Sequence, residues 1–517
     1  MKKPTIKTCP LTTKWLYVIA IIGGLLQAFA FDFPFNSSVT FLAPIASFIS
    51  LLIFLFAVVR LSVKRGLLFA YLFGLAFFGW GLNWVYISMA TYGKAPLPFA
   101  IFANVAVIAY LSLYWLVAAL FILKLGKTTN QRLLLAAPVI ALLEWVRSVF
   151  IIGFPWLSIG YAWVDTPIAN LASFGGVFFV SFIVVLSASL CLLKIKPLHK
   201  NLLLLKVGIL LAIVCFPFAN IQSISNKTTV ALVQGNMPVI TQYNANQMNK
   251  NLIQYQLLTE KTVAENTDID AVIWAETAIP YFYQDARPFL DDIHRLQQEK
   301  QFDLISGVPT YTNEKYYNAI VFQAKTETPI ASFYKKQHLL PFGEYTPLRG
   351  LLNIFKDYVQ IPMADFSRGE VVQQPFTIGL NRFAPSICFE AVFGDEIRQN
   401  AQNADVLLNI SNDAWFGKSK AQSQHLNIAR MRAIENQKYL IRATNNGITA
   451  VIAPNGSVEK SLPPFEEGVL TASVIGNDKN TLYSKIGDMP YVIFFALWGL
   501  IIWAVSVFYS HKRKANT

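Results

Sequence analysis

Charged side chains are scarce in this chain, and negatively charged ones are almost absent from its first part. Asp, Glu, Lys and Arg together make up 14% of the 517 residues, whereas a soluble domain carries roughly 25%. Before residue 221 the only acids are Asp32, Glu144 and Asp165. This distribution excludes a disordered chain and an ordinary soluble globule. It indicates that the first 220 residues lie in lipid and that most of the remainder lies in water.

Cysteine clusters and nucleotide-binding motifs are also lacking. The four Cys form no C-x-x-C pair and the five His are scattered along the chain, so we expect neither a disulfide scaffold nor a bound metal. No G-x-G-x-x-G and no P-loop sequence occurs, so we expect no nucleotide cofactor.

What the first part does contain is long apolar runs. A helix that spans a membrane needs about 20 mostly apolar residues. Eight segments approach this length: 15–31, 41–59, 67–89, 98–123, 133–152, 171–193, 202–219 and 490–509. We therefore predict a membrane domain of seven helices at 1–219. An eighth helix with a basic tail is predicted at 490–517.

Lys and Arg cluster at alternate ends of these segments, for example at 2–14, 124–132 and 512–514. Loops rich in Lys and Arg stay in the cytoplasm, so both termini should be cytoplasmic and residues 220–489 should lie outside the cytoplasm. The net charge of +13 is then explained by topology, and no nucleic-acid partner is expected. The first span is open to a second interpretation as a signal peptide, because Ala28-Phe29-Ala30 resembles a cleavage site.

Glu144 and Arg147 stand inside the predicted fifth span. Charged groups at membrane depth mark either function or an internal pair, and residues three apart share one helix face. The sequence leaves two interpretations open: a structural ion pair, or a contact with a lipid headgroup.

From residue 228 onward short β-rich runs alternate with helix-like stretches. The runs lie at 228–234, 271–274, 302–308, 318–323, 384–389, 404–410, 447–454 and 469–474. Helix-like stretches lie at 245–266, 286–300 and 421–439. This alternation predicts a layered α/β domain at 220–489, large enough to have its own core.

Three residues of this domain form a candidate set for acyl transfer. Cys388 ends a strand-like run just before a turn and a helix, where helix N–H groups can activate a thiol; an inert core thiol is the alternative. Glu276 follows another strand, as a general base can. Lys336 stands in "FYKKQHLLPFGEYTP" and could stabilise an oxyanion, although it could also be a surface lysine.

These residues carry a resemblance to a known family. A strand-end Glu, then Y-x-K-x-H-L-x-P-F-G-E, then C-x-E resembles the nitrilase superfamily. "SNDAWFG" at 411–417 and "ARMRAIENQKYLIRATNNGIT" at 429–449, with spans on both sides, are similar to its membrane-embedded branch, the apolipoprotein N-acyltransferases. The resemblance implies an αββα sandwich for the exported domain and a catalytic triad of Glu276, Lys336 and Cys388.

The resemblance also implies supporting residues. The glutamate of P-F-G-E corresponds to Glu344, and the glutamate after the Cys pair corresponds to Glu390. Three positions depart from the family pattern: Ala275 stands where Pro is common, Phe389 where Tyr is common, and Tyr243 where Trp is common.

The family resemblance implies a function and a location. An acyl chain would pass from a membrane phospholipid, through a Cys thioester, to the α-amino group of a diacylglyceryl-cysteine at the N-terminus of an apolipoprotein. The protein would be a multi-pass enzyme of the bacterial inner membrane, with the catalytic domain on the periplasmic side and no feature that demands an oligomer. The alternatives are a membrane-tethered nitrilase-type amidase and a non-enzymatic transporter or scaffold.

Other residues near these motifs have more than one possible role. We expect His338 to be a structural hydrogen-bonding residue rather than a partner of the thiol, while Glu344 either supports Lys336 or moves a proton itself. Asn412, Asp413 and Trp415 are expected to shape a loop beside the site. The segment 345–366 has a helical apolar stripe and is either a lipid gate or part of the domain's core.

Overall fold

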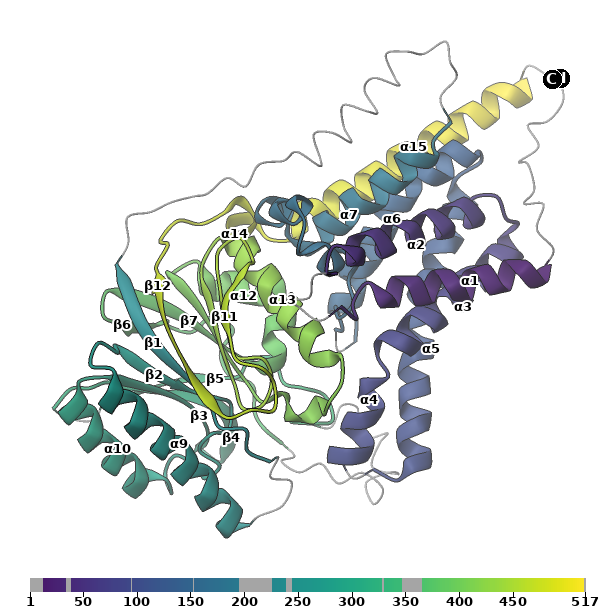
Figure 1. Cartoon of the computed structure of the whole chain (residues 1–517). Coiled ribbons are helices and arrows are strands. Elements are labelled where there is room, and N and C mark those ends of the chain that lie inside the picture. The colour runs from purple at the N-terminus through teal and green to yellow at the C-terminus, as the bar shows by residue number, and fades with distance from the viewer. Residues whose placement is uncertain are drawn as a thin grey trace. The chain divides into compact units, whose positions relative to one another are not determined.

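The computed structural model of this chain describes residues 13–33, 39–93, 95–151, 153–194, 226–238, 244–327, 330–345 and 365–515. These residues form two compact units (Figure 1). The helical unit contains the described residues up to Asn83, those from Ile101 to 194, and those from Ile486 onward. The α/β unit contains Trp84–Ala100 and the described residues from 226 to Lys485.

The helical unit consists mainly of apolar helices. Its elements are α1 (Thr13–Phe29), α2 (Leu42–Val58), α3 (Val63–Gly81), α5 (Leu97–Leu125, whose first turn groups with the other unit), α6 (Thr129–Val149), η2 (Ile159–Trp163), η3 (Pro167–Leu171), α7 (Ala172–Leu192) and α15 (Met489–Ala515).

Within the described residues, four helices are long and apolar enough to cross a membrane: Val63–Gly81, Leu97–Leu125, Pro167–Leu192 and Met489–Phe508. Helices α1 and α2 are apolar but shorter. The predicted span 202–219 lies outside the described residues, so the count of eight stays a prediction. The third predicted span, 67–89, differs from the structure because α3 ends at Gly81.

Glycines let the helices of this unit approach each other closely. Gly24 of α1 faces the backbone carbonyl of Phe73 in α3, and a Cβ atom there would collide with it. A Cβ at Gly74 would lie 2.9 Å from the Cα of Ser112 in α5. Such close approach is the usual role of small residues between membrane helices, where van der Waals packing drives association.

Glu144 and Arg147 form a pair at the end of α6. Their side chains are 4.0 Å apart, and Arg147 donates hydrogen bonds to the backbone carbonyls of Phe154 and Trp156 at 2.8 and 2.5 Å. Glu144 accepts one from the N–H of Ile159 at 2.8 Å. The pair therefore holds the segment that follows α6, and this geometry favours the structural interpretation over a headgroup contact.

The α/β unit contains two six-stranded sheets. The first has the order β12-β1-β2-β3-β4-β5 and the second the order β11-β10-β9-β8-β7-β6. The first sheet comprises β1 (Lys227–Gln234), β2 (Ala271–Trp274), β3 (Asp303–Thr312), β4 (Lys315–Gln323), β5 (Ala331–Lys335) and β12 (Gly468–Ile475). The second comprises β6 (Phe376–Ile378), β7 (Asn381–Ile387), β8 (Val406–Ser411), β9 (Leu440–Thr444), β10 (Ala450–Ile452) and β11 (Val458–Ser461).

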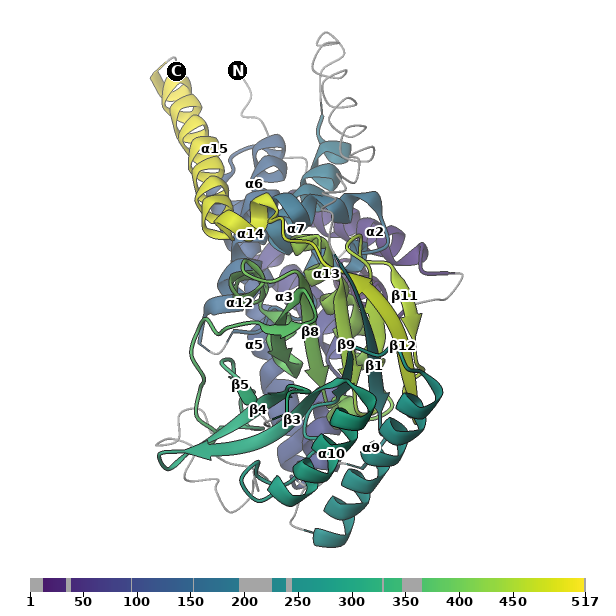
Figure 2. The same ribbon diagram turned by 90° about the vertical axis from the view of Figure 1, so that its left-hand side faces the viewer.

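The two sheets face each other across an apolar core. Ile273 and Ile320 of the first sheet and Leu408 and Ile441 of the second belong to one buried cluster. Helices α9 (Ala245–Glu265) and α10 (Arg287–Lys300) cover the outer face of the first sheet (Figure 2). Helices α12 (Gly394–Ala401) and α13 (Ala421–Asn436) pack on the second. This arrangement of layers agrees with the predicted αββα sandwich. One face of each sheet packs against the other sheet, and the opposite face packs against helices.

Strand directions bring the predicted site residues to one edge. Strand β2 is parallel to β3, whereas β4 is antiparallel to both β3 and β5, so β5 points the same way as β2. Glu276 lies just after β2 and Lys336 just after β5. Their side chains therefore project from the same edge of the first sheet.

The segment Trp84–Ala100 groups with the α/β unit, although the sequence assigns it to the membrane domain at 1–219. It contains α4 (Trp84–Ile87) and the π-helical turn η1 (Ser88–Tyr92). The indole N–H of Trp84 donates to Gln424 at 3.2 Å, and the Ser88 hydroxyl donates to the carbonyl of Trp415 at 2.8 Å. Hydropathy alone does not reveal these contacts, which form between residues more than three hundred positions apart.

Candidate active site

Glu276 is held at the end of β2 by backbone contacts. Its Oε2 accepts a hydrogen bond from the N–H of Asn412 at 2.8 Å. Thr277, the next residue, adopts a left-handed conformation with φ 56°. Gly307 of β3 lies so close that a Cβ atom there would be 2.6 Å from the Cα of Glu276. Only a glycine at this position leaves room for the turn that carries Glu276.

Lys336 is buried in a cluster with two carboxylates. Its side chain is 2% exposed, and its Nζ lies 3.5 Å from Glu276 and 3.0 Å from Glu344. Asn318 of β4 donates from the same amide nitrogen to Glu276 at 2.9 Å and to Glu344 at 2.6 Å. Glu344 also accepts from the N–H of Leu340 at 2.7 Å. Glu344 therefore holds the ammonium group of Lys336 in place next to Glu276.

The charges in this cluster decide the protonation of Lys336. Burial alone would lower its pKa, but the neighbouring carboxylates Glu344 and Glu276 outweigh burial and raise the pKa well above the usual range. The side chain therefore stays an ammonium at neutral pH. A fixed positive charge in a site with little water is what stabilises a developing oxyanion.

Cys388 occupies a strained position at the end of β7. Its φ is 50°, a left-handed conformation that costs a residue with a side chain roughly 1–2 kcal/mol. Burial, together with the charge of Glu276, raises the pKa of its thiol well above the usual range, although Lys336 opposes this. The thiol interacts electrostatically with both residues, so the three predicted triad members lie together.

Glu390 ties the turn after Cys388 to the segment that carries Lys336. It is 1% exposed, and its two oxygens accept from the N–H groups of Ile387 and Gln337, both at 2.6 Å. The hydroxyl of Tyr334 donates to it as well, at 2.9 Å. Burial raises the pKa of Glu390 to about 7, against the opposing charge of Lys336. Glu390 therefore connects the two sheets immediately behind the site.

Phe389 and His338 lie beside this turn. The ring of Phe389 packs edge-on against Phe393, with centroids 5.3 Å apart. His338 stacks on the same Phe393 at 3.6 Å, and its Nδ1 lies 2.9 Å from Glu396. These contacts give the imidazole a structural hydrogen-bonding position, as the sequence leads us to expect.

Trp415 lies in the short turn η6 (Asp413–Phe416), which begins directly after Asn412. Its carbonyl accepts from Ser88, and its ring meets that of Tyr92 edge-on with centroids 6.1 Å apart. Since the N–H of Asn412 binds Glu276, the segment Trp84–Ala100 supports the loop that positions the predicted base.

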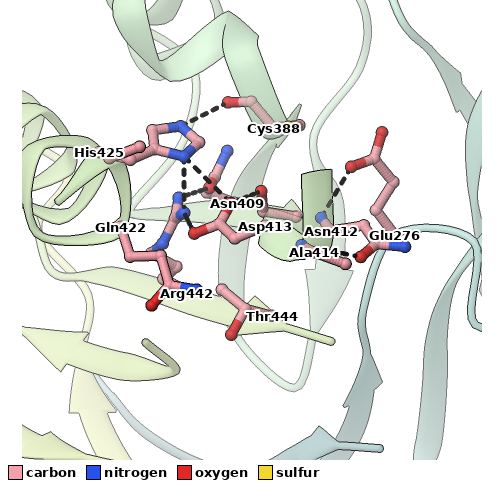
Figure 3. A network of polar contacts seen from close by, with 12 residues as sticks. Glu276, Cys388, Asn409, Asn412, Asp413, Ala414, Gln422, His425, Arg442 and Thr444 are labelled. Atoms are coloured by element: carbon pink, nitrogen blue, oxygen red, sulfur yellow. Dashed lines mark hydrogen bonds and ion pairs between the residues drawn. The ribbon is translucent and has the colours of Figure 1, made fainter. Parts of the chain in front are cut away.

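Two expectations fall outside the described residues. Tyr243 lies in 239–243, and most of the predicted gate segment lies in 346–364. The sequence does not single out Asn318, whose only local sign is a polar residue at the start of the buried stretch 318–321 of β4. Nor does it reveal the buried polar network behind Cys388, in which Asp413, expected only to shape a loop, joins His425 and Arg442 (Figure 3).

Comparisons with known proteins agree with this architecture. A family model described as carbon-nitrogen hydrolase matches residues 229–477. A second model, described as the apolipoprotein N-acyltransferase N-terminal domain, matches residues 23–190.

Similar curated proteins match most of the chain. A protein of Vibrio vulnificus named apolipoprotein N-acyltransferase is 35% identical over 472 residues, which are 88% of this chain and 90% of that protein. Proteins of the same name from Photobacterium profundum and Haemophilus influenzae are 35% and 33% identical, and the matches cover 94% and 97% of this chain and 94% and 96% of those proteins. The chain therefore belongs to the apolipoprotein N-acyltransferase family.

Proposed function

We propose that this protein transfers an acyl chain from a membrane phospholipid to the α-amino group of the diacylglyceryl-cysteine that begins an apolipoprotein. The observation that carries the proposal is the buried cluster of Glu276, Lys336 and Glu344 beside Cys388. The relatives' shared name supports the choice of substrates.

The first half-reaction loads the thiol. Glu276 takes the proton from Sγ of Cys388, and the thiolate attacks the carbonyl carbon of the phospholipid ester. The oxyanion that forms is stabilised by the ammonium of Lys336. When the intermediate collapses, the C–O bond breaks and the glycerol oxygen leaves with the proton that Glu276 returns. The products are a thioester on Cys388 and a lysophospholipid.

The second half-reaction transfers the chain to an amine. The α-amino group of the acceptor attacks the thioester carbonyl and loses a proton to Glu276. The C–S bond then breaks, and Cys388 regains a proton as the amide is released. The burial of the site supports a thioester that persists between the two half-reactions. Glu276, Lys336 and Cys388 are 7%, 2% and 9% exposed. Restricted access of water slows hydrolysis of the thioester before the amine arrives.

The test of this proposal is the mass of the protein after mixing with phospholipid. Without an acceptor, we expect one acyl chain to accumulate on Cys388, and we expect it to disappear when a diacylglyceryl-cysteine peptide is added. Continuous release of free fatty acid would instead indicate an amidase or hydrolase. If neither an adduct nor turnover occurs, the protein is not an acyltransferase for these substrates.

We further propose that the protein is a multi-pass protein of the bacterial inner membrane with eight spans. The α/β unit would be periplasmic and both termini cytoplasmic. The support is the uneven distribution of Lys and Arg between alternate loops and the four described helices that are long and apolar enough to span. In this arrangement both lipid substrates reach the site from the periplasmic leaflet of the inner membrane.

This topology can be tested with reporters. Fused after Thr517, a reporter that functions only in the cytoplasm should be active. Inserted at Asn313, in the turn between β3 and β4, a reporter that functions only outside the cytoplasm should be active. The opposite pattern at Thr517 would contradict the eight-span count and the periplasmic position of the site.

A further inference from the structure

Behind Cys388 lies a polar network that the proposed reaction does not use. His425 of α13, Asp413 of η6 and Arg442 of β9 are all fully buried. Figure 3 shows the imidazole of His425 directed at the backbone carbonyl of Cys388, with Asp413 and Arg442 on the other side of the ring. Ionisable groups this deep are costly unless each has partners, so their position next to the nucleophile calls for an explanation.

The contacts of the imidazole determine where its proton lies. Nε2 of His425 is 3.2 Å from the backbone carbonyl oxygen of Cys388, and Nδ1 is 2.9 Å from the guanidinium of Arg442. A carbonyl oxygen only accepts hydrogen bonds, so Nε2 carries a proton. Nδ1 also lies 3.1 Å from Oδ1 of Asp413, but burial and the charge of Arg442 keep the ring neutral by lowering the pKa of His425, so Nδ1 accepts from the guanidinium, which only donates. The proton is then on Nε2, which donates to the carbonyl of Cys388.

The other two members keep this arrangement in place. Arg442 also donates to Asp413 at 2.8 Å and to Asn409 at 2.5 Å. Asp413 accepts from the hydroxyl of Ser411 at 2.6 Å. Burial alone would raise the pKa of Asp413, but Arg442 and these hydrogen bonds hold it well below the usual range. Asp413 therefore stays charged and fixes the guanidinium.

Burial, with the charge of Arg442, also lowers the pKa of His425 below its ordinary value, although Asp413 opposes this. A neutral ring with one proton on Nε2 agrees with the contacts above. Gly447 leaves room for the carboxylate of Asp413, because a Cβ atom at this position would lie 2.5 Å from its oxygen.

We propose that His425 is a positioning residue for the nucleophile: its Nε2–H holds the carbonyl of Cys388 and so keeps this residue in the left-handed conformation that presents the thiol. The inference rests on the proposed role of Cys388. Because the left-handed conformation is strained, a residue with no such bond would populate other backbone conformations in which Sγ points elsewhere. His425 touches neither substrate nor the reacting sulfur in this role.

Two substitutions of similar size separate this role from simple packing. In His425→Gln, the side-chain amide N–H can take the position of Nε2 and donate to the carbonyl of Cys388. In His425→Asn, the shorter side chain places its amide only at the position of Nδ1, so this hydrogen bond is lost. We expect thioester formation in a single turnover with phospholipid micelles to be about tenfold slower for the Asn variant than for the Gln variant, as the loss of one hydrogen bond predicts. The KM for phospholipid and the unfolding midpoint should be alike in both.

Equal rates for the two variants would overturn the inference, and so would a rate loss that parallels a lower unfolding midpoint of the Asn variant. Neither result would affect the proposed function, which depends on whether the wild-type protein forms the thioester at all.

A measurement on the wild-type protein avoids any folding defect. In histidine labelled with nitrogen-15, the ring that responds to alkylation of Cys388 should carry a single proton, on Nε2, at neutral pH. A proton on Nδ1, or on both nitrogens, would contradict the inference.

Discussion

Replacing Cys388 by alanine should abolish phospholipid-dependent acylation while the protein remains folded. The thiol is the atom that forms the covalent intermediate, so its removal eliminates both half-reactions. We expect less than about one hundredth of the wild-type rate, because a positioned catalytic group contributes about 10²–10⁴-fold. Loss of one buried sulfur should cost only about 1 kcal/mol of stability, and alanine tolerates the left-handed backbone as well as cysteine does. Acyl transfer to a diacylglyceryl-cysteine peptide measures the effect.

The matched control is Cys191→Ala. Cys191 is a free, exposed cysteine near the end of α7, in the helical unit and outside the candidate site, so this variant should retain wild-type activity. A Cys388→Ala protein that keeps more than about one hundredth of the wild-type rate would point to another nucleophile. If both variants unfold at the same midpoint as the wild-type protein, the loss of activity in Cys388→Ala is caused by the missing thiol and not by a damaged fold.

The chemical residues of the site could be predicted from the sequence because each carries a local signal. Glu276 and Cys388 each follow a buried apolar run that ends at a turn, and Lys336 stands two residues before a histidine in a distinctive motif. Strand ends are where a sheet presents functional side chains. The structure places these three residues together, which agrees with that expectation, while their roles in catalysis remain proposals.

The roles of Asn318 and His425 could not be predicted, because their partners depend on how distant elements pack together. Asn318 binds Glu276 and Glu344, which are 42 and 26 positions away. His425 reaches the carbonyl of Cys388 across 37 positions. No periodicity in one segment encodes such a pairing, since it arises from how β4 and α13 pack against other elements. A polar residue in a buried stretch is the only local sign of it.

The helix boundaries show the same limit. Residues 67–89 read as one apolar run, yet α3 ends at Gly81. The following residues, Trp84 and Ser88, bind Gln424 and the carbonyl of Trp415. Tertiary hydrogen bonds thus override hydropathy where an apolar segment packs on the α/β unit.

Replacing Glu276 by glutamine should prevent both half-reactions. The glutamine side chain has nearly the same shape and its oxygen can still accept from the N–H of Asn412, but an amide cannot take a proton from the thiol or the amine. We expect the rate of thioester formation to fall about 10²–10⁴-fold. Because the charge of Glu276 helps to raise the pKa of Cys388, its removal should make the thiol more acidic. A slower reaction despite a more acidic thiol therefore identifies the missing proton acceptor as the cause.

Single-turnover formation of the acyl-enzyme measures the first step. The second step is measured by adding the acceptor peptide to Glu276→Gln protein that has acquired its thioester on long incubation, and by comparing its rate of transfer with that of the wild-type acyl-enzyme. Glu396→Gln is the control, since Glu396 contacts His338 and lies outside the cluster around Lys336; it should retain most of the wild-type rate. Thioester formation at the normal rate in Glu276→Gln would show that another group accepts the thiol proton. Glu344 would then be the first candidate, because its carboxylate is 3.0 Å from the same ammonium and shares the amide of Asn318 with Glu276.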